Sequence, residues 1–567
     1  MKKFRFFEKL FEHDYIIFCL SILIGGICSI LHGVDRSFDV RNYHIYNPYA
    51  FLNNRITIDI MPADIQSYFN PLLDVPYYLM VKHLNNFPYL VSFIQGLSYA
   101  LLIFITYKIA KFIFDGHYNK KLYILLSVII GSTGALTLYN IGTLTHDIFV
   151  GDIVLISIYL ILKVIKKHSY INTLLSGILL GSICGLKLTA GIFGFAMICS
   201  LVLFYKDINK PIKTICLFSI SAFIGFLITN GFWMWKLYSI FHNPFFPYFN
   251  SIFKSDFTNC ADMLKTDFQG LYPENIWQYL FFPFYFYQHL PTKGFEINYQ
   301  DFRFAAIYVC LIINIFIYIT NKFRKIRLNE TSINFKAINF ILLICIFTYL
   351  IWINTFATIR YLTPISALSG IITIAILTKL LYFIKEYFSI SDVIKFNHKQ
   401  YHFEINYKNV IIPALIIFVT LYLVTKTIEP EMLKRVPIHD KVLEVQTMDI
   451  PDNAIVLVSS GSGMIIPFQN PNAKYIYINA PRFTEEDIYI LSDKNLAQIK
   501  QEINKNKDKT YFILDLAIYQ KTFDLTQKTL HKYAELDFYK SDCKFIYTNI
   551  YNKKNRSFYV LCKADIK

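Results

Sequence analysis

Apolar runs of about 20 residues recur along the chain, and this pattern restricts its fold more than any other feature. A run of that length crosses the hydrocarbon core of a bilayer as an α-helix. Of the 567 residues 54% are hydrophobic and 17% are charged, whereas soluble domains carry about a quarter charged residues. The mean hydropathy is +0.39. The sequence therefore predicts a polytopic α-helical membrane protein.

We expect about eleven spanning or near-spanning segments, judged by length and apolar content. The first is interpreted as a retained signal anchor, because no clear cleavage signature follows it. The fourth and fifth are short enough to be tilted or partly re-entrant, and Leu186-Lys187-Leu188 joins the fifth and sixth as a tight hairpin would. The segments are residues 15–31, 88–107, 122–141, 148–162, 171–186, 188–205, 214–235, 304–320, 337–356, 362–381 and 410–425.

Basic residues give the topology. The net charge of +16 does not indicate nucleic-acid binding, because the chain has no compact basic domain with base-stacking aromatics. With a cytoplasmic N-terminus, the Lys and Arg clusters fall in cytoplasmic connections, as the positive-inside rule requires; they lie at 108–121, 163–167, 206–213, 322–336 and 379–408. We therefore expect a multi-pass domain (1–428) of the inner membrane with long outer loops at 32–87 and 236–303.

Beyond residue 428 the apolar runs shorten to strand length, and helix-compatible stretches such as 484–506 separate some of them. This alternation predicts a small extracytoplasmic α/β domain over 429–567. The Gly461-Ser462-Gly463 turn is interpreted as a tight turn, because it lacks a Rossmann context. Cys543 and Cys562 would be able to pair in an oxidising compartment. The expected strands are 454–460, 474–480, 510–516, 544–550 and 557–563.

The outer loop from Phe38 to Asp74 is longer and more polar than a connector requires. Its first aspartate, Asp39, is either a solvated loop carboxylate or a catalytic base. In the second case neighbouring aromatics would bury Asp39 and raise its pKa, with Arg41 and His44 tuning it. The remaining aspartates of the loop are expected to shape it; they are Asp59, Asp64 and Asp74.

Two further outer connections carry polar residues at helix ends. Asp147 would cap the fourth segment, since an aspartate at a helix start satisfies free amides. His146 beside it would be able to bind a metal or a phosphate, but two ligands alone do not make a metal site. Asp152, one turn further in, is a site candidate because ionisable residues at that depth are costly.

Two cations lie at the outer membrane boundary, Lys187 and Arg360. Each alone is explained by snorkelling of a long cationic side chain to the interface. Together on one face they would be able to hold a lipid-linked phosphate, because Arg offers a planar fork to phosphate oxygens. Tyr361 follows Arg360 directly. Aromatic-rich stretches at 242–250 and 281–290 are either interfacial anchors or surfaces that hold a sugar or a polyprenyl chain.

The motifs FDVRNYHIYNPYAFLNNR, IQSYFNPLLDVPYY, NPFFPYFN and RYLTP resemble bacterial members of the GT-C superfamily of integral-membrane glycosyltransferases. These members are related to the protein-mannosyltransferase and lipid-A aminoarabinose-transferase groups. The resemblance covers roughly residues 1–425 in layout. It implies that Asp39 holds the catalytic first-loop position, Asp147 with His146 the second-loop acidic position, and Arg360 the donor phosphate. Many relatives have a second acid after the catalytic one, where this chain has Val40.

The expected activity is inverting transfer of a sugar from a polyprenyl-phosphate donor to a glycan or lipid acceptor of the cell envelope. No nucleotide is needed, no cofactor is certain, and a divalent metal is possible. The alternatives are a transporter or flippase of lipid-linked glycans and a non-catalytic envelope scaffold. The candidate catalytic residues are Asp39, His44 and Asp147. The candidate substrate-binding residues are Arg41, Tyr43, His146, Lys187, Arg360 and Tyr361; no metal ligands are assigned.

Overall fold

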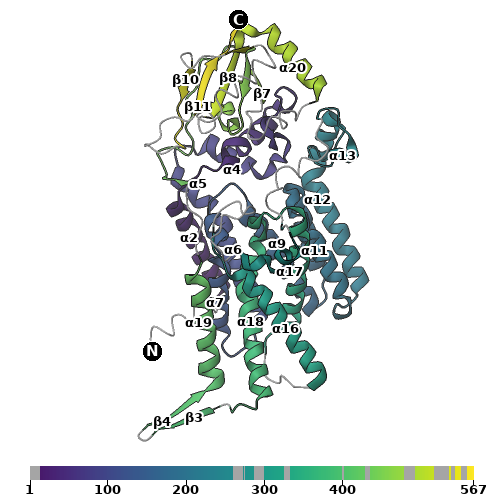
Figure 1. The fold of residues 1–567 in the computed structure, drawn as a ribbon, viewed down its shortest axis with the longest axis vertical. Coiled ribbons are helices and arrows are strands. Elements are labelled where there is room, and N and C mark those ends of the chain that lie inside the picture. The colour runs from purple at the N-terminus through teal and green to yellow at the C-terminus, as the bar shows by residue number, and fades with distance from the viewer. Residues whose placement is uncertain are drawn as a thin grey trace.

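The protein is an elongated stack of a helical region, a layer of short helices and turns, and a small β-sheet (Figure 1). The structure, a computed structural model, describes residues 13–258, 273, 275–285, 299–324, 332–391, 393–398, 401–427, 435–477, 492–515, 536–537, 543–550 and 559–566. The middle layer is built mainly from the first loop, with β1 (Val34–Asp35), α3 (Tyr46–Leu52), β2 (Pro62–Ile65) and α4 (Val75–His83).

Within the described residues, eight helical segments are long and apolar enough to cross a membrane. They are α2 (Asp14–His32), α5 with α6 (Pro88–Gln95, Leu97–Phe114), α9 (Asp147–Lys166), α12 (Pro211–Phe241), α16 (Arg303–Arg324), α17 (Phe335–Thr355), α18 (Thr363–Tyr387) with the preceding turn Ile359–Leu362, and α19 (Ile412–Thr425) with the preceding turn Tyr407–Ile411. Two apolar helices are shorter, α10 (Tyr170–Leu186) and α11 (Gly191–Leu203). A polytopic helical protein is thus confirmed, and the count of about eleven spans stays a prediction.

The third expected segment, 122–141, is not one helix. It is divided into α7 (Lys120–Ser132) and α8 (Ala135–Tyr139). The buried Arg303 donates to the carbonyls of Ile130 (2.7 Å) and Thr133 (2.8 Å), while Asp301 accepts from the Ala135 amide (2.9 Å). Helix ends leave backbone groups without partners. These two side chains supply the partners, so the break is stable among apolar neighbours.

The fourth segment is longer than expected. α9 has 20 residues and is therefore a full-length span, which corrects the expectation that this segment is short. The fifth segment, α10, has 17 residues and ends at Leu186. Lys187 is extended and leads directly into the turn Leu188–Ala190 and α11, so the tight connection expected there is present.

Several spans leave large apolar side chains uncovered by protein. On α12, Phe223, Ile228 and Trp235 are 62%, 65% and 72% exposed. Continuous apolar surface of this kind marks contact with a membrane or another protein. Together with the length of the helix, the exposed face of α12 is that of a lipid-facing span.

The C-terminal region forms a five-stranded mixed sheet in the order β10-β11-β8-β6-β7. β6 pairs in parallel with β7 and β8, and β11 pairs antiparallel with β8 and β10. Each strand falls within or beside an expected one, while residues 478–480 and 557–558 lie outside the described part. The strands are β6 (Ile455–Val458), β7 (Lys474–Tyr477), β8 (Thr510–Asp515), β10 (Cys543–Ile546) and β11 (Tyr559–Lys563).

Minor elements complete the fold. One helix of the C-terminal region, α20 (Asp493–Lys505), lies within the stretch expected to be helical, whose start at 484–491 is outside the described residues. Cys543 and Cys562, opposite each other on β10 and β11, form a disulfide. The other helices and strands in the described part of the chain are α13 (Asn250–Phe253), α15 (Ile276–Tyr285), β3 (Val393–His398), β4 (Tyr401–Asn406), β5 (Arg435–Val436), β9 (Leu536–Asp537) and β12 (Asp565–Ile566).

The sheet packs directly on the first loop. Ile60 adds to the β7 edge as a parallel bridge to Ile476, with Tyr477 N donating to Ile60 O at 2.8 Å. One apolar core contains Val40, Tyr46 and Tyr77 of the loop region together with strand residues such as Val456 and Tyr559. The loop therefore lies between the helices and the sheet, as Figure 1 shows. The hairpin of β3 and β4 lies at the opposite end of the molecule.

Candidate functional site

A π-helical turn, Val40–His44, follows Asp39 and positions the start of the first loop. Asn42, in its centre, is fully buried. Its amide nitrogen donates to Ala63 O at 3.0 Å, and its carbonyl oxygen accepts from the Gly461 amide at 3.1 Å. Single π-helical turns occur frequently at functional sites. The turn is thus held by both the loop and the C-terminal region.

Gly463 allows the C-terminal region to approach this turn closely. A Cβ atom at Gly463 would overlap the backbone carbonyl of Asn42. The interpretation of Gly461-Ser462-Gly463 as a tight turn is consistent with Gly461 at φ 80°, and the turn also serves as the docking surface for Val40–His44.

Gly463→Ala is expected to lower the free energy of unfolding by about 1–3 kcal/mol, because backbone must move to admit the methyl group. Thermal unfolding of the purified protein measures the effect. Gly191→Ala is the matched control, because nothing lies within 4 Å of a Cβ at that position. Equal stability of the two variants would contradict the close approach.

Four charged residues from separate segments form an ion-pair chain, Lys187–Asp147–Arg360–Asp39. Arg360 Nη1 lies 3.3 Å from Asp39 Oδ2, and Arg360 Nε lies 3.6 Å from Asp147 Oδ2. Lys187 Nζ binds Asp147 Oδ1 and donates to the Thr145 carbonyl at 2.8 Å. The first loop and the ends of α9, α10 and the turn before α18 meet here.

Asp39 is buried as expected, but its pKa is shifted in the opposite direction from the one expected. Its side chain is 18% exposed, so it is mostly buried. Burial raises the pKa of Asp39, but the charge of Arg360, with smaller contributions from His44 and Lys187, outweighs burial. The pKa is therefore lowered from 3.8. The expectation of a raised pKa is wrong because it considered burial by neighbouring aromatics and omitted the charge of Arg360, which lies 321 residues further along the chain.

Two expectations for the charged residues at the helix ends are also corrected. The residue preceding α9 is His146, and Asp147 uses its carboxylate for Lys187 and Arg360 as an ion partner instead of a cap. Lys187 is held by Asp147 and lies 5.2 Å from the centre of the Tyr361 ring, so snorkelling does not describe it. Arg360 lies 5.6 Å from the centre of the same ring. Tyr361 thus contacts both cations.

Arg41 and Tyr43, both in the π-helical turn, contact different parts of the protein. Arg41 Nη1 pairs with Asp515, at the end of β8, and is turned toward the C-terminal sheet. Tyr43 packs on the His44 ring, with centroids 4.1 Å apart. Burial, followed by the negative charges of Asp39 and Asp74, raises the pKa of Tyr43 well above 10.0. Tyr43 is therefore a neutral hydroxyl close to both carboxylates.

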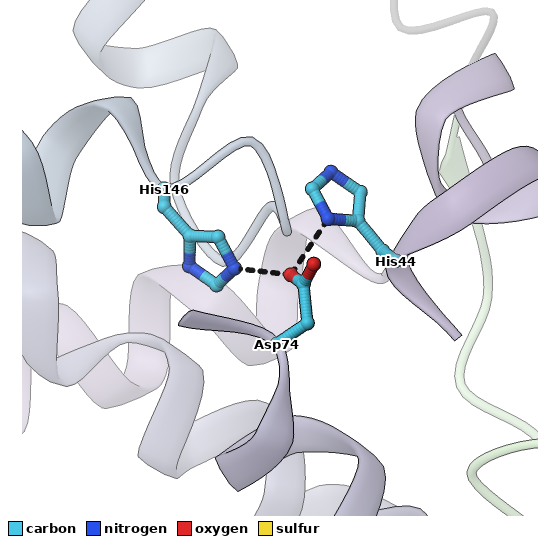
Figure 2. Close-up of side chains that lie close together, drawn as sticks. All are labelled: His44, Asp74 and His146. Carbon is cyan, nitrogen blue, oxygen red and sulfur yellow. Dashed lines mark hydrogen bonds and ion pairs between the residues drawn. The ribbon is translucent and has the colours of Figure 1, made fainter. Parts of the chain in front are cut away.

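His44 and His146 meet at Asp74, a residue expected only to shape the loop (Figure 2). His44 Nδ1 lies 2.7 Å and His146 Nε2 lies 2.8 Å from the same oxygen, Asp74 Oδ1. We call these residues the His–Asp–His cluster. Asp74 lies directly before α4, and an aspartate at this position, before Val75-Pro76, is typical of a helix cap. Its side chain nevertheless makes no cap bond. His146, at φ 58°, is in the left-handed region and connects the cluster to the ion-pair chain through Asp147.

The aromatic stretch 242–250 is partly core. Phe246 is buried and stacks on Phe241 of α12, with centroids 4.2 Å apart, while Phe249 is 46% exposed. Tyr248 stacks on Phe69 of the first loop. The second stretch is described only to residue 285, in α15. The first stretch thus fixes the loop against α12.

Comparison of the sequence with protein-family models and with curated proteins gave no match.

Proposed function

We propose that the chain transfers a sugar from a polyprenyl-phosphate donor to a glycan or lipid acceptor of the cell envelope, as a GT-C-type inverting glycosyltransferase. The observation that carries the proposal is the ion-pair chain Lys187–Asp147–Arg360–Asp39. It places two cations and a candidate base together at the ends of membrane-spanning helices, where the phosphate of a membrane-anchored donor would lie.

The lowered pKa of Asp39 is compatible with its role as the base if the donor phosphate replaces Asp39 as the ion partner of Arg360. A carboxylate paired with a guanidinium is a weak base, because the ionised form is stabilised. Donor phosphate that binds Arg360 and Lys187 would weaken the Arg360–Asp39 pair and add negative charge beside Asp39. Both changes raise the basicity of Asp39. Asp39 would then accept the proton of the acceptor hydroxyl as the acceptor oxygen bonds to the anomeric carbon of the sugar. The bond from that carbon to the phosphate oxygen breaks at the same time, and the polyprenyl phosphate leaves, stabilised by the two cations.

The topology in this proposal places the N-terminus in the cytoplasm and the ion-pair chain and C-terminal sheet on the outer face of the inner membrane. The distribution of basic residues supports this orientation. The disulfide between Cys543 and Cys562 supports it independently, because disulfides persist in oxidising compartments.

The activity is tested with the full chain in liposomes, a panel of polyprenyl-phosphate donors with labelled sugars, and envelope extract as the acceptor source. The expected result is release of polyprenyl phosphate that matches the appearance of label in non-donor material. Intact donor across the panel, with correctly folded protein, would contradict the proposal.

Arg360→Lys is expected to raise the KM for the donor by about 10- to 100-fold, because Lys keeps the charge but loses the fork that binds two phosphate oxygens. Steady-state kinetics with the active donor measures this change. Arg324→Lys is the control; Arg324 is an exposed cation at the end of α16. An unchanged KM in Arg360→Lys would remove Arg360 from donor binding.

One observation favours transport of a lipid-linked glycan as a second candidate function. Asp152 is fully buried within α9, and neither carboxylate oxygen has a hydrogen-bond partner among the described residues. Ionisable groups inside the membrane often mark transport pathways. Movement of labelled donor between leaflets of protein-containing liposomes, without sugar transfer, would favour transport over glycosyl transfer.

A further inference from the structure

Three potential metal ligands converge in the His–Asp–His cluster. His44, Asp74 and His146 each offer one ligand atom, and these atoms all lie within 4.8 Å of one another. They come from the π-helical turn, from the residue before α4 and from the residue before α9, so tertiary folding brings them together. Figure 2 shows both imidazole rings pointing at one carboxylate oxygen.

Asp74 is a buried carboxylate without a permanent cation. Its ion partners among the described residues are the two histidines, with no Lys or Arg. A buried charge requires a compensating charge or strong hydrogen bonds. Three other buried carboxylates of the region each have a permanent cation: Asp59 has Arg55, Asp147 has Lys187, and Asp515 has Arg41. Asp74 therefore lacks the permanent cationic partner that these three carboxylates have, and a bound metal ion would supply that positive charge.

We propose that His44, Asp74 and His146 bind a zinc ion. Two imidazoles and one carboxylate are a ligand set that zinc takes in sites with three protein ligands, which leave a fourth position open. Calcium and magnesium prefer oxygen ligands and fit this set poorly. Ligand atoms around tetrahedral zinc are about 3.3 Å apart, from bonds of about 2.0 Å. Small side-chain rotations would open the present 2.7 and 2.8 Å separations to that spacing.

The burial of the ligands agrees with an open fourth position. The side chains of His44 and Asp74 are 4% and 5% exposed, whereas that of His146 is 17% exposed. We therefore expect an ion and a fourth ligand to enter on the His146 side, where the cluster is most exposed. Asp147, next to His146, belongs to the ion-pair chain, so the zinc would lie close to the candidate donor site.

The competing interpretation is a hydrogen-bond network in which both imidazoles donate to Asp74 Oδ1. The buried Nε2 atom of His44 has no hydrogen-bond partner among the described residues in either interpretation, so it does not separate the two. The two interpretations differ in metal content, which can be measured without any substrate.

The test uses the full chain, purified in detergent with an affinity tag that contains no histidine. Mass spectrometry of the elements counts zinc per chain, before and after stripping with a chelator and reloading with ZnCl₂. Reloading with Co²⁺ gives a visible absorption spectrum that reports the ligands. The expected result is one zinc per chain, a cobalt spectrum of a four-coordinate site, and zinc-dependent thermal stabilisation of the unmodified protein.

The variants are Asp74→Asn and His146→Gln, and both are expected to lose at least 90% of the zinc. His83→Gln, an exposed histidine at the end of α4, is the control and should retain it. Less than a tenth of a zinc per reloaded chain, iron in place of zinc, or zinc that persists in both variants would overturn the proposal. The zinc measurement involves no substrate, so the two proposals can fail separately. Zinc binding without sugar transfer would refute only the proposed function, and sugar transfer without zinc binding would refute only the metal site.

Discussion

Asp39→Asn is expected to lower kcat for sugar transfer by about 100- to 10,000-fold, which is the usual contribution of a general base. The amide is isosteric with the carboxylate, so Arg360 retains a hydrogen-bond acceptor at this position. The KM for the donor should stay the same or fall, since Arg360 loses its competing negative partner. Steady-state kinetics with varied donor concentration separates the two parameters.

The matched control for this variant is Asp115→Asn. Asp115 is also an aspartate with a cationic partner, Lys120 at 3.7 Å, but its side chain is 65% exposed. Exposed pairs contribute about 0–1 kcal/mol, so neither activity nor stability should change measurably. An Asp39→Asn protein with more than half the original kcat would exclude Asp39 as the base.

The lowered pKa of Asp39 also predicts how activity depends on pH. A base acts when it is deprotonated, and its contribution is lost only as the pH falls through its pKa. Because Arg360 and the other cations hold the pKa of Asp39 below 3.8 in the free protein, kcat/KM should show no loss due to Asp39 between pH 8 and pH 5. A fall in kcat/KM in this interval that disappears in Asp39→Asn would show that the free carboxyl has a raised pKa.

The spanning helices and the strands could be predicted from sequence because each depends on a local pattern. Among the described residues, apolar runs of helical length gave eight predicted segments a counterpart long enough to span a membrane, and short apolar runs near turns gave each predicted strand a counterpart. The break between α7 and α8 could not be predicted in this way. It depends on Asp301 and Arg303, which lie more than 160 residues further along the chain. The bond between Asp301 and the Ala135 amide, for example, joins residues that are 166 positions apart.

The candidate site could be predicted only in part, because it too depends on contacts between residues that lie far apart in the sequence. Topology placed Asp39, Asp147, Lys187 and Arg360 on one face, and the structure brings these four together. Asp74 was missed, because its partner His146 is 72 residues away and no local pattern joins them. Asp515, the partner of Arg41, is 474 residues away and was missed for the same reason. Their roles follow from tertiary contacts, and the pairing of Arg41 with β8 shows that the C-terminal sheet completes the loop.

The anchor between the loop and the sheet is the buried pair of Arg55 and Asp59, which are 4% and 5% exposed. Arg55 holds both carboxylate oxygens and also donates to the backbone carbonyls of Pro471 and Ala473. Asp59 accepts from the Tyr475 amide at 3.0 Å. The pair therefore joins the first loop to β7 by side-chain and backbone bonds at once.

Arg55→Met is expected to cost about 3–5 kcal/mol, because Asp59 is left as a buried charge without a partner. Hydrogen exchange measures the effect locally, at the Tyr475 and Tyr477 amides that bond to Asp59 and Ile60. Their protection should fall by about 100-fold or more, at about 1.4 kcal/mol per factor of ten. The amides of the helices should be affected much less, since the loss is confined to the loop–sheet contact.

Lys441→Met is the control for the Arg55 variant, because it breaks the half-exposed pair of Lys441 and Glu444 in the same region. Exposed pairs contribute about 0–1 kcal/mol, so protection of β7 should change little. Adding Asp59→Asn to Arg55→Met removes the unpaired charge and should recover part of the lost protection, as a double-mutant cycle would reveal. If Arg55→Met and Lys441→Met had equal effects on the Tyr475 amide, the C-terminal sheet would be held to the loop by apolar packing alone, and Arg55 would have no anchoring role.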